Sequence, residues 1–337
     1  MPFATIAAIQ IKMEKNRLSD HISAAPHSQF FIDVIKGLRL QRKRLNSKYF
    51  YDSEGDRLFH EIMNSPEYYL TNCEMEIFTE QADAISALLM QVGSAFDLIE
   101  LGAGDASKTV HLLENLLKKE AAFRYLPIDI SPNIIASLEK ELPNQLPKLD
   151  FKGFEGEYFN MLEKACMDSD RRKVVLFLGS NIGNMTTTAA KEFCKELRSY
   201  LSRGDIAIIG FDLKKNPHTI LAAYNDSAGF TRDFNLNLLT RINRELQADF
   251  ILEKFRHYPH YDPRSGACKS YLISVEEQVV RIGNEKIHFA MNEYISMEIS
   301  QKYTFRKIEE LALYCGFSPH HNFFDDKKWF VDTAWII

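Results

Sequence analysis

Short apolar runs alternate with helical patterns through the middle of this chain. The runs span residues 96–101, 123–128, 174–178 and 205–211. Apolar residues without polar alternation indicate strands that are buried on both faces of a sheet. Helical patterns occupy residues 107–118 and 187–201 between them, and Ser131-Pro132 supplies an N-cap and a proline at the first helical position. Strands that alternate with helices predict an α/β protein with a doubly wound, mostly parallel sheet.

The pattern differs on either side of this sheet. Helical patterns cover residues 29–66, with a polar break at 45–56, and continue over 72–92. After Asp212 the alternation stops. From there the periodicity predicts a helix over 216–246, antiparallel strands over 250–300, a helix over 305–314 and a strand over 329–337.

These changes of pattern predict two domains and a leader. The sheet domain is expected to contain residues 73–213 and 302–337, and the leader residues 1–27. Residues 28–72 and 214–301 are expected to form a second, α+β domain that binds the substrate. A length of 337 residues agrees with this number of domains.

Composition excludes several classes of function. The net charge of −5 gives no hint of the basic face that nucleic-acid binding requires. The five cysteines form no C-x-x-C pair, and the histidine pairs His257/His260 and His320/His321 have no third ligand at a recognisable spacing. Neither a disulfide framework nor a metal site is therefore expected. No apolar run approaches the ~18 residues that span a bilayer, and no signal peptide is recognised. We expect a cytoplasmic monomer that binds neither nucleic acid nor membrane.

The first predicted strand ends in a glycine turn, Glu100-Leu-Gly102-Ala-Gly104-Asp-Ala-Ser107-Lys108. Ligands of doubly wound sheets bind at the carboxyl ends of strands, and glycine lets the backbone approach them closely. Asp129 ends the second strand, where a carboxylate can accept hydrogen bonds from both ribose hydroxyls. The turn and Asp129 together favour an adenosine-containing ligand, although Asp129 can also be a plain helix-entry residue.

The same turn bears on the class of cofactor. Ser107 occupies the third position of G-x-G-x-x-G, where the pyrophosphate of a dinucleotide favours glycine. S-adenosylmethionine (SAM) has no phosphate, so its loop is less constrained. The late helix and apolar strand also suit the reversed seventh strand of class I methyltransferases. These features leave a nicotinamide dehydrogenase and a SAM-dependent methyltransferase both open.

Three longer motifs carry a resemblance to one family. They are Lys48-Tyr-Phe-Tyr51-Asp-Ser-Glu-Gly55 with Ser65-Pro-Glu-Tyr68-Tyr69, then Phe177-Leu-Gly179-Ser-Asn-Ile-Gly183-Asn184, and Leu221-Ala-Ala-Tyr224-Asn-Asp-Ser-Ala-Gly229-Phe-Thr231 with Phe234-Asn235. From about residue 29 to its C-terminus the chain resembles the histidine-specific Nα-methyltransferases of ergothioneine biosynthesis. The resemblance implies a class I Rossmann-like methyltransferase fold. It also implies SAM-dependent trimethylation of the α-amino group of free histidine to the betaine hercynine.

The resemblance also implies the roles of individual residues. The family's cofactor contacts fall on Tyr68, Gly102, Lys108, Asp129 and the pair Glu157-Tyr158. At that pair the family more often has aspartate and phenylalanine. Gly104 is added to the expected cofactor-binding residues because it lies in the glycine turn. The substrate carboxylate is assigned to Tyr68, Asn184 and Tyr224. Gly179 is expected at the edge of the substrate pocket, with Thr231 and Phe234 in the substrate site. Tyr51, near the amine, and Asn184 are the expected catalytic residues.

Recognition of the imidazole ring is assigned by the resemblance to Glu298 and Ser300. Residues i and i+2 of a strand face the same side, so a carboxylate and a hydroxyl can meet both ring nitrogens. Without the resemblance, a solvated strand face is the simpler interpretation. Ser270 aligns with the family's usual methionine near the ring, which implies a larger or more polar side-chain pocket. Another amino acid, such as a tryptophan derivative, is therefore the alternative substrate.

Two other functions compete with amino-acid methylation. The turn after the third long strand, Gly179-Ser-Asn-Ile-Gly183-Asn184, lacks the N/D-P-P-aromatic motif of DNA adenine methyltransferases. A non-catalytic adenosine-binding protein of the same fold is disfavoured by the complete set of tyrosines and Asn184.

The expected mechanism is alignment of nitrogen, methyl carbon and sulfur, with reacting atoms about 3 Å apart. The amine must be neutral, and water or a tyrosine oxygen takes its proton.

Overall fold

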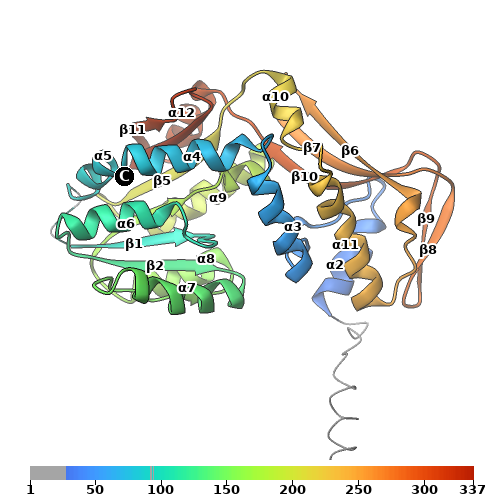
Figure 1. Cartoon of the computed structure of the whole chain (residues 1–337), viewed down its shortest axis with the longest axis horizontal. Helices are drawn as coiled ribbons and strands as arrows, with labels where there is room; N and C mark the ends of the chain where they lie inside the picture. The colour runs from blue at the N-terminus through green and yellow to red at the C-terminus, as the bar shows by residue number, and fades with distance from the viewer. Residues whose placement is uncertain (1–27, 92, 94) are drawn as a thin grey trace, which may run out of the picture. The chain divides into compact units, whose positions relative to one another are not determined.

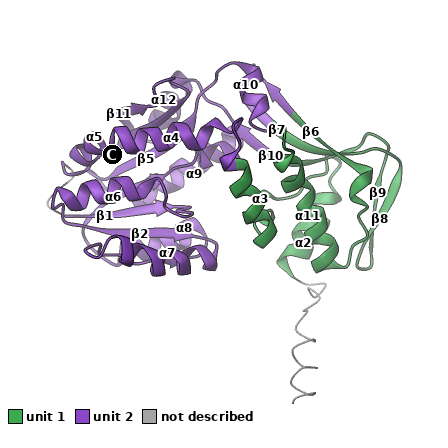
Figure 2. Ribbon diagram, viewed as in Figure 1, with its two compact units in different colours: residues 1–62, 225–259, 269–298 green, residues 63–224, 260–268, 299–337 purple. Residues whose placement is uncertain are grey.

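The computed structural model describes residues 28–91, 93 and 95–337, so the predicted leader lies outside the described residues. The chain forms two compact units, coloured separately in Figure 2. Unit 1 extends to Ile62 and includes Asn225–Pro259 and Lys269–Glu298, whereas unit 2 contains Met63–Tyr224, His260–Cys268 and Ile299–Ile337. These boundaries differ from those of the predicted domains, because residues 63–72, 214–224, 260–268 and 299–301 belong to the unit that contains the large sheet.

Unit 2 is built on a seven-stranded sheet with the order β11-β12-β5-β4-β1-β2-β3 (Figure 1). Its strands are β1 (Phe96–Leu101), β2 (Phe123–Asp129), β3 (Phe154–Glu155), β4 (Arg172–Phe177), β5 (Ile206–Asp212), β11 (Ser318–Phe324) and β12 (Phe330–Ile336). Strands β1 to β5 pair in parallel, whereas β12 is antiparallel to both β5 and β11. The doubly wound, mostly parallel sheet is confirmed, and β12 is the reversed strand expected near the chain end.

Helices cover both faces of this sheet. One face packs against α4 (Tyr69–Glu80), α5 (Ala82–Leu89), α6 (Thr109–Lys118) and α7 (Pro132–Gln145), the other against α8 (Tyr158–Met167), α9 (Thr187–Tyr200) and α12 (Phe305–Tyr314). In β1, Leu98 faces the first helical layer and Ile99 faces the second. Every residue of β1 and β5 is buried, which explains their apolar sequences.

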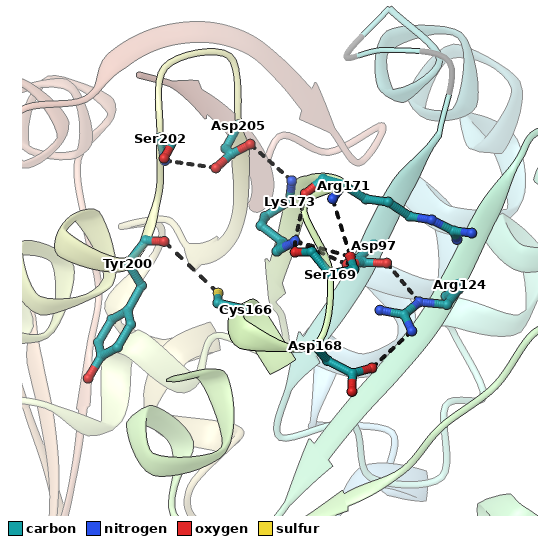
Figure 3. A network of polar contacts seen from close by, with 10 residues as sticks. All are labelled: Asp97, Arg124, Cys166, Asp168, Ser169, Arg171, Lys173, Tyr200, Ser202 and Asp205. Carbon is teal, nitrogen blue, oxygen red and sulfur yellow. Dashed lines mark hydrogen bonds and ion pairs between the residues drawn. The ribbon is translucent and has the colours of Figure 1, made fainter. Parts of the chain in front are cut away.

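A polar network lies where the strands of unit 2 begin (Figure 3). Fully buried Asp97 accepts from Arg124 at 2.9 Å and from Lys173 at 3.1 Å. Burial alone raises the pKa of Asp97, but hydrogen bonds from Arg124, Ser169 and Lys173 outweigh it and hold that pKa below its usual value. The network is at the amino ends of parallel strands, whereas ligands of such sheets bind at the carboxyl ends. Its role is therefore to hold the strands together.

The remaining elements belong largely to unit 1. They are α2 (Gln29–Leu38), α3 (Ser53–Asn64), α11 (Phe230–Leu246), β6 (Phe255–Asp262), β7 (Ala267–Ser274), β8 (Gln278–Ile282), β9 (Glu285–Phe289) and β10 (Tyr294–Gln301). The strands form a sheet of order β10-β7-β6 and an antiparallel β8-β9 hairpin. The predicted strands of residues 250–300 are thus confirmed as strands. The helix predicted over 216–246 is interrupted: α10 (Pro217–Ala222) ends before Gly229, which has a φ of +82° and precedes α11.

Some elements were not predicted. Strand β11, the short β3 and helix α8 had no sequence prediction, and the helix predicted over 72–92 is divided at Gln81 into α4 and α5. Ser131 is confirmed as the N-cap of α7, since its side chain accepts the Ile134 N–H, and Pro132 occupies the first turn. Within the described residues, every helix is too short or too polar to cross a membrane.

Candidate active site

The glycine turn and the end of β2 are tied together in unit 2. Gly102 and Gly104 have φ angles of +74° and +54°. The Gly102 N–H donates to the Ile128 carbonyl at 2.8 Å, and the Gly104 N–H donates to Asp129 Oδ2 at 3.2 Å. The structure therefore brings together Gly102, Gly104 and Asp129, as the sequence predicted.

Asp129 also accepts the Ser131 N–H at 2.9 Å through its other oxygen. Asp129 is thus also a helix-entry residue, because its carboxylate accepts a hydrogen bond from Ser131, the N-cap of α7. Each carboxylate oxygen has two acceptor positions, so these two amide contacts use only half of its capacity. Both oxygens can still accept a hydroxyl hydrogen from a ligand.

Tyr158 and Glu157 lie at the start of α8. A Cβ added to Gly102 would lie 2.8 Å from the Tyr158 hydroxyl oxygen, so this side chain reaches the glycine turn. Its ring packs edge-on against Phe177, with centroids 5.8 Å apart. Burial raises the pKa of Tyr158, which keeps its hydroxyl a donor. Glu157 is exposed at the N-cap position of the helix.

Glu74 of α4 connects two of the predicted site residues. Its side chain is 1% exposed, forms an ion pair with Lys108, and accepts the Gly179 N–H at 2.7 and 2.9 Å through its two oxygens. Burial lowers the pKa of Lys108, but the charge and hydrogen bond of Glu74 raise it by more, so the pKa is above its usual value. A single carboxylate therefore holds the predicted cofactor lysine and the loop after β4.

Asp332 of β12 is a second buried acid beside Glu74. Within the described residues, neither of its side-chain oxygens has a hydrogen-bond donor. Burial, followed by the charge of Glu74, raises the pKa of Asp332 well above its usual value, and Lys108 opposes this rise. Burial and the neighbouring charge thus favour the neutral form of Asp332.

The two tyrosines assigned to the substrate carboxylate are neighbours in unit 2. Tyr68 precedes α4 and Tyr224 follows α10, and their rings meet edge-on with centroids 6.3 Å apart. Asn184 ends the short helix η2 (Asn181–Asn184) after β4, with its side chain exposed. All three residues therefore belong to segments of the sheet unit.

Ser300 and Tyr224 are in direct contact. The Tyr224 hydroxyl donates to Ser300 Oγ at 2.7 Å, and the Lys302 ammonium donates to both oxygens, each also at 2.7 Å. Lys302 is ion-paired with Asp212 at 2.6 Å, and both side chains are fully buried. Lys215 pairs with the same carboxylate, and the Tyr69 hydroxyl donates to it at 2.8 Å.

Glu298 lies in unit 1, where Asn235 of α11 donates to its carboxylate at 3.2 Å. The same amide donates to the Thr231 carbonyl at 2.9 Å, so Asn235 ties Thr231 to Glu298. Burial raises the pKa of Glu298 to about 7, against the smaller effect of the Asn235 hydrogen bond. Glu298 is half-buried and hydrogen-bonded, which does not fit a fully solvated strand face.

Tyr51 and Phe234 belong to an aromatic cluster of unit 1. Their ring centroids are 5.9 Å apart, and each also contacts Phe59, at 5.8 and 5.9 Å respectively. Phe234 is buried, whereas Tyr51 is 44% exposed. The predicted site residues are thus divided: Tyr51, Thr231, Phe234 and Glu298 belong to unit 1, and the others belong to unit 2.

Three charged residues that were not predicted from the sequence pair with candidate site residues or with one another: Glu74, Asp212 and Lys302. Each is buried and paired, which a single sequence does not reveal, because charged residues are ordinarily exposed. One signal was present for Lys302. Lys302 follows Glu298 and Ser300 at the same two-residue spacing, directly after the end of β10.

Comparisons with known proteins bear on the family of this chain. A family model described as histidine-specific methyltransferase, SAM-dependent, matches residues 30–336. The chain is 32% identical to the histidine N-alpha-methyltransferase of Mycolicibacterium smegmatis, over 90% of this chain and 91% of that protein. It is 30% identical to ergothioneine biosynthesis protein 1 of Schizosaccharomyces pombe, over 78% of this chain and 35% of that protein. A 4-dimethylallyltryptophan N-methyltransferase of Epichloe festucae var. lolii is 28% identical over 57% of each chain.

Proposed function

Because the chain belongs to the family of histidine-specific, SAM-dependent methyltransferases, we propose that it transfers methyl groups from SAM to the α-amino group of free L-histidine. The product is the trimethylated betaine hercynine, an intermediate of ergothioneine biosynthesis. The similarity to a protein named ergothioneine biosynthesis protein 1 supports this role.

The residues around the glycine turn fit SAM. A Cβ added to Gly104 would enter space that the described residues leave open, and Asp129 beside it has acceptor capacity for ribose hydroxyls. Lys108 supplies a positive charge that complements the carboxylate of an amino-acid cofactor. Tyr68, Gly102, Glu157 and Tyr158 complete the proposed cofactor-binding set.

Bound SAM supplies a methyl group that its sulfonium sulfur already activates. The protein must therefore orient the amine and keep it neutral rather than supply strong acid–base catalysis. We assign the substrate carboxylate to Tyr68, Asn184 and Tyr224, and the amine to Tyr51. Because ammonium is the main form of an amine near pH 7, a water molecule or a tyrosine oxygen must accept its proton.

The observation that carries the choice of histidine is the desolvated carboxylate of Glu298. Its pKa of about 7 leaves a substantial ionised fraction at neutral pH, and that form accepts a hydrogen bond from an imidazole N–H. We assign the ring to Glu298 and Ser300, with Gly179, Thr231 and Phe234 in the same substrate site. A ring that offers no donor would leave the carboxylate unpaired at a cost of roughly 1–3 kcal/mol. The indole ring of tryptophan offers one N–H but no second ring nitrogen for Ser300.

Mass spectrometry of histidine incubated with the enzyme and SAM tests this function. We expect mass gains in methyl steps up to the trimethylated product, with formation of S-adenosylhomocysteine (SAH). Tryptophan serves as the competing substrate in the same mixture. Histidine that stays unmodified while tryptophan gains methyl groups would contradict the proposal.

Replacing Glu298 with alanine is expected to reduce the preference for histidine over tryptophan. Loss of one hydrogen bond to a charged group corresponds to a fall of about 10- to 100-fold in the ratio of the two kcat/KM values. The ratio, measured under competition, separates this effect from a general loss of activity. A variant that retains the wild-type preference would exclude Glu298 from ring recognition.

A tryptophan derivative is the second candidate substrate. One relative is named as a 4-dimethylallyltryptophan N-methyltransferase, and Ser270, which aligns with the family's methionine, is small and 1% exposed. Within the described residues its hydroxyl has no hydrogen-bond partner, so it can bind a polar group of a substrate. We further propose that the enzyme acts as a cytoplasmic monomer without nucleic acid.

A further inference from the structure

Lys302 is an unusual residue because its ammonium group is completely buried. The side chain and its partner Asp212 are both 0% exposed, and their charged atoms are 2.6 Å apart. The other two contacts of the ammonium are the oxygens of Tyr224 and Ser300, each at 2.7 Å. All three donor hydrogens of Lys302 are therefore used, which offsets the cost of burying its charge.

These contacts fix the direction of the two hydroxyl groups. Lysine only donates, so both oxygens must turn a lone pair toward it and neither hydrogen can point that way. The Tyr224 hydrogen lies between the oxygens, since Tyr224 donates to Ser300 at 2.7 Å. The Ser300 hydrogen must then point away from Lys302. An incoming acceptor can take the Ser300 hydrogen directly. It receives the Tyr224 hydrogen only when that hydrogen turns from Ser300 toward it, while Lys302 continues to occupy a lone pair of each oxygen.

The same cluster carries net positive charge. One carboxylate, Asp212, faces two ammonium groups, Lys215 and Lys302, and both lysine side chains are at most 5% exposed. Two lysines and one carboxylate give a formal charge of +1 behind Tyr224 and Ser300, although burial lowers the pKa of Lys215. Hydrogen bonds that a cation polarises are stronger toward an anionic acceptor.

We propose that Lys302 is a positioning residue that orients Tyr224 and Ser300 and strengthens them as donors for an amino-acid substrate. This inference rests on the proposed function, which assigns Tyr224 to the substrate carboxylate and Ser300 to the imidazole ring. Lys302 acts through these hydroxyls and contacts no substrate atom itself. It explains how a carboxylate is bound without a direct ion pair.

Comparison of Lys302→Met with Lys215→Met tests the inference by steady-state kinetics. Both variants remove one buried ammonium from Asp212, but only Lys302 contacts Tyr224 and Ser300. We expect Lys302→Met to raise KM for histidine about tenfold or more, because both hydroxyls lose their orientation. KM for histidine should rise less in Lys215→Met, which removes the same charge but leaves both hydroxyl contacts of Lys302 intact. The SAH affinity of both variants should stay within about twofold of wild type.

Equal KM values in the two lysine variants would overturn the inference, because a general loss of stability or charge would then explain the effect. A change of the Lys302→Met variant in SAH affinity alone would overturn it as well. Addition of Tyr224→Phe to Lys302→Met should raise KM by much less than the product of the single effects. Independent effects of the two substitutions would show that Lys302 does not act through Tyr224.

A measurement on the wild-type protein covers the case in which Lys302→Met does not fold. Buried ammonium groups in protein with isotope-labelled lysine are observed by NMR, and Lys215→Met assists their assignment. Histidine should shift the Lys302 signal, whereas histamine, which lacks the carboxylate, should shift it less. An unchanged signal in the histidine-bound protein would overturn the inference.

The two proposals fail in different ways. If the wild-type enzyme methylates histidine and Lys302→Met keeps the wild-type KM, only the role of Lys302 is wrong. If the wild-type enzyme leaves histidine unmodified, the proposed function is wrong. The two lysine variants are then compared with the amino acid that the enzyme does accept.

Discussion

At the residue scale, the contrast between Asp97 and Glu298 shows how partners determine the charge of a buried carboxylate. Asp97 has donors on three side chains, and its pKa is below the usual value although burial opposes this. Glu298 has one amide donor, and burial raises its pKa to about 7. The first carboxylate is held ionised by its donors, whereas the second has a single side-chain donor, from Asn235.

Glu298→Gln should stabilise the protein at alkaline pH. The folded-state pKa of about 7 is above the ordinary 4.5, so the folded form holds this proton more tightly than the unfolded form. The resulting stability is fully present below about 4.5 and is lost as the pH rises through about 7. Glutamine does not ionise, so the free energy of unfolding of the variant relative to wild type should rise by roughly 1–3 kcal/mol between these limits. Urea unfolding at both ends of this range measures the change, and a constant difference would contradict it.

Glu74→Gln should weaken both stability and SAH binding. Glutamine leaves the buried Lys108 without its counter-charge, although Asp332 can ionise in its place once the charge of Glu74 is gone. We expect a loss of about 1–2 kcal/mol for the single variant and roughly 3 kcal/mol when Asp332→Asn is added. Urea unfolding and calorimetric titration with SAH measure the two effects. Glu80→Gln, an exposed position on the same helix, is the control and should change stability by less than about 0.5 kcal/mol.

At the element scale, the site depends on where strands end and helices begin. The turn after β1, the end of β2 and the start of α8 supply Gly102, Asp129 and Tyr158. Helix α4 supplies Glu74, which holds the loop after β4 through the Gly179 N–H. Because these segments are tied by their own hydrogen bonds, the cofactor side of the site is formed by unit 2 itself.

The two glycines of the turn should respond differently to alanine. Both have positive φ angles, so each substitution costs about 1–2 kcal/mol in backbone strain. At Gly102 the new Cβ would also lie 2.8 Å from the Tyr158 oxygen, whereas at Gly104 it would enter open space beside Asp129. Gly102→Ala should therefore lose more stability, and Gly104→Ala should lose SAH affinity at a smaller stability cost. Thermal unfolding without ligand and titration with SAH measure these losses, and the opposite order would contradict the assignment.

Elements with a clear period were predictable and those without one were not. Strand β1 and helix α12 have the predicted bounds, because their residues follow a single pattern and end at clear signals. Strand β11 is an edge strand whose residues are mostly exposed or partly buried, so its apolar content is too low to indicate a strand. The division between α4 and α5 at Gln81 has no glycine or proline to announce it.

The predictability of the site follows the same division. Gly102, Gly104 and Asp129 were found from local sequence, since a turn and a strand end are local features. Tyr68, Tyr224, Glu298 and Ser300 entered only through the resemblance, because their meaning depends on contacts between distant segments. The Tyr224–Ser300 hydrogen bond joins residues 76 positions apart, and no local pattern encodes such a contact.

At the scale of the whole molecule, two compact units share the predicted residues, and all of the proposed cofactor-binding residues belong to unit 2. Ligand binding stabilises the part of a protein that forms the ligand's contacts, by an amount set by mass action. The effect of SAH alone should therefore distinguish the units.

SAH at about 100 times its Kd should raise the free energy of local opening in unit 2 by up to about 2.7 kcal/mol. Amide hydrogen exchange should slow most in residues 96–118 and 123–145, which contain β1, α6, β2 and α7. Exchange in the β8-β9 hairpin of unit 1 serves as the internal control and should change least. Slowing confined to that hairpin would contradict the placement of the cofactor site.

One feature of unit 2 bears on how enzymes of this kind diversify. The chain leaves unit 2 after Tyr224, returns to it for His260–Cys268, and returns for the last time at Ile299. Tyr303 N–H donates to the Asp212 carbonyl at 2.9 Å, and Lys214 N–H donates to the Tyr303 carbonyl at 2.8 Å, beside the Lys302–Asp212 pair. These two hydrogen bonds join the chain before Tyr224 to the chain after Ile299, and they are formed by residues of unit 2 itself. The segments Asn225–Pro259 and Lys269–Glu298 can therefore accumulate substitutions or be exchanged for those of a relative. The hydroxyls of Tyr224 and Ser300 keep their contacts with Lys302 in that case. Evolution can thereby alter the accepted side chain without rebuilding the apparatus of methyl transfer.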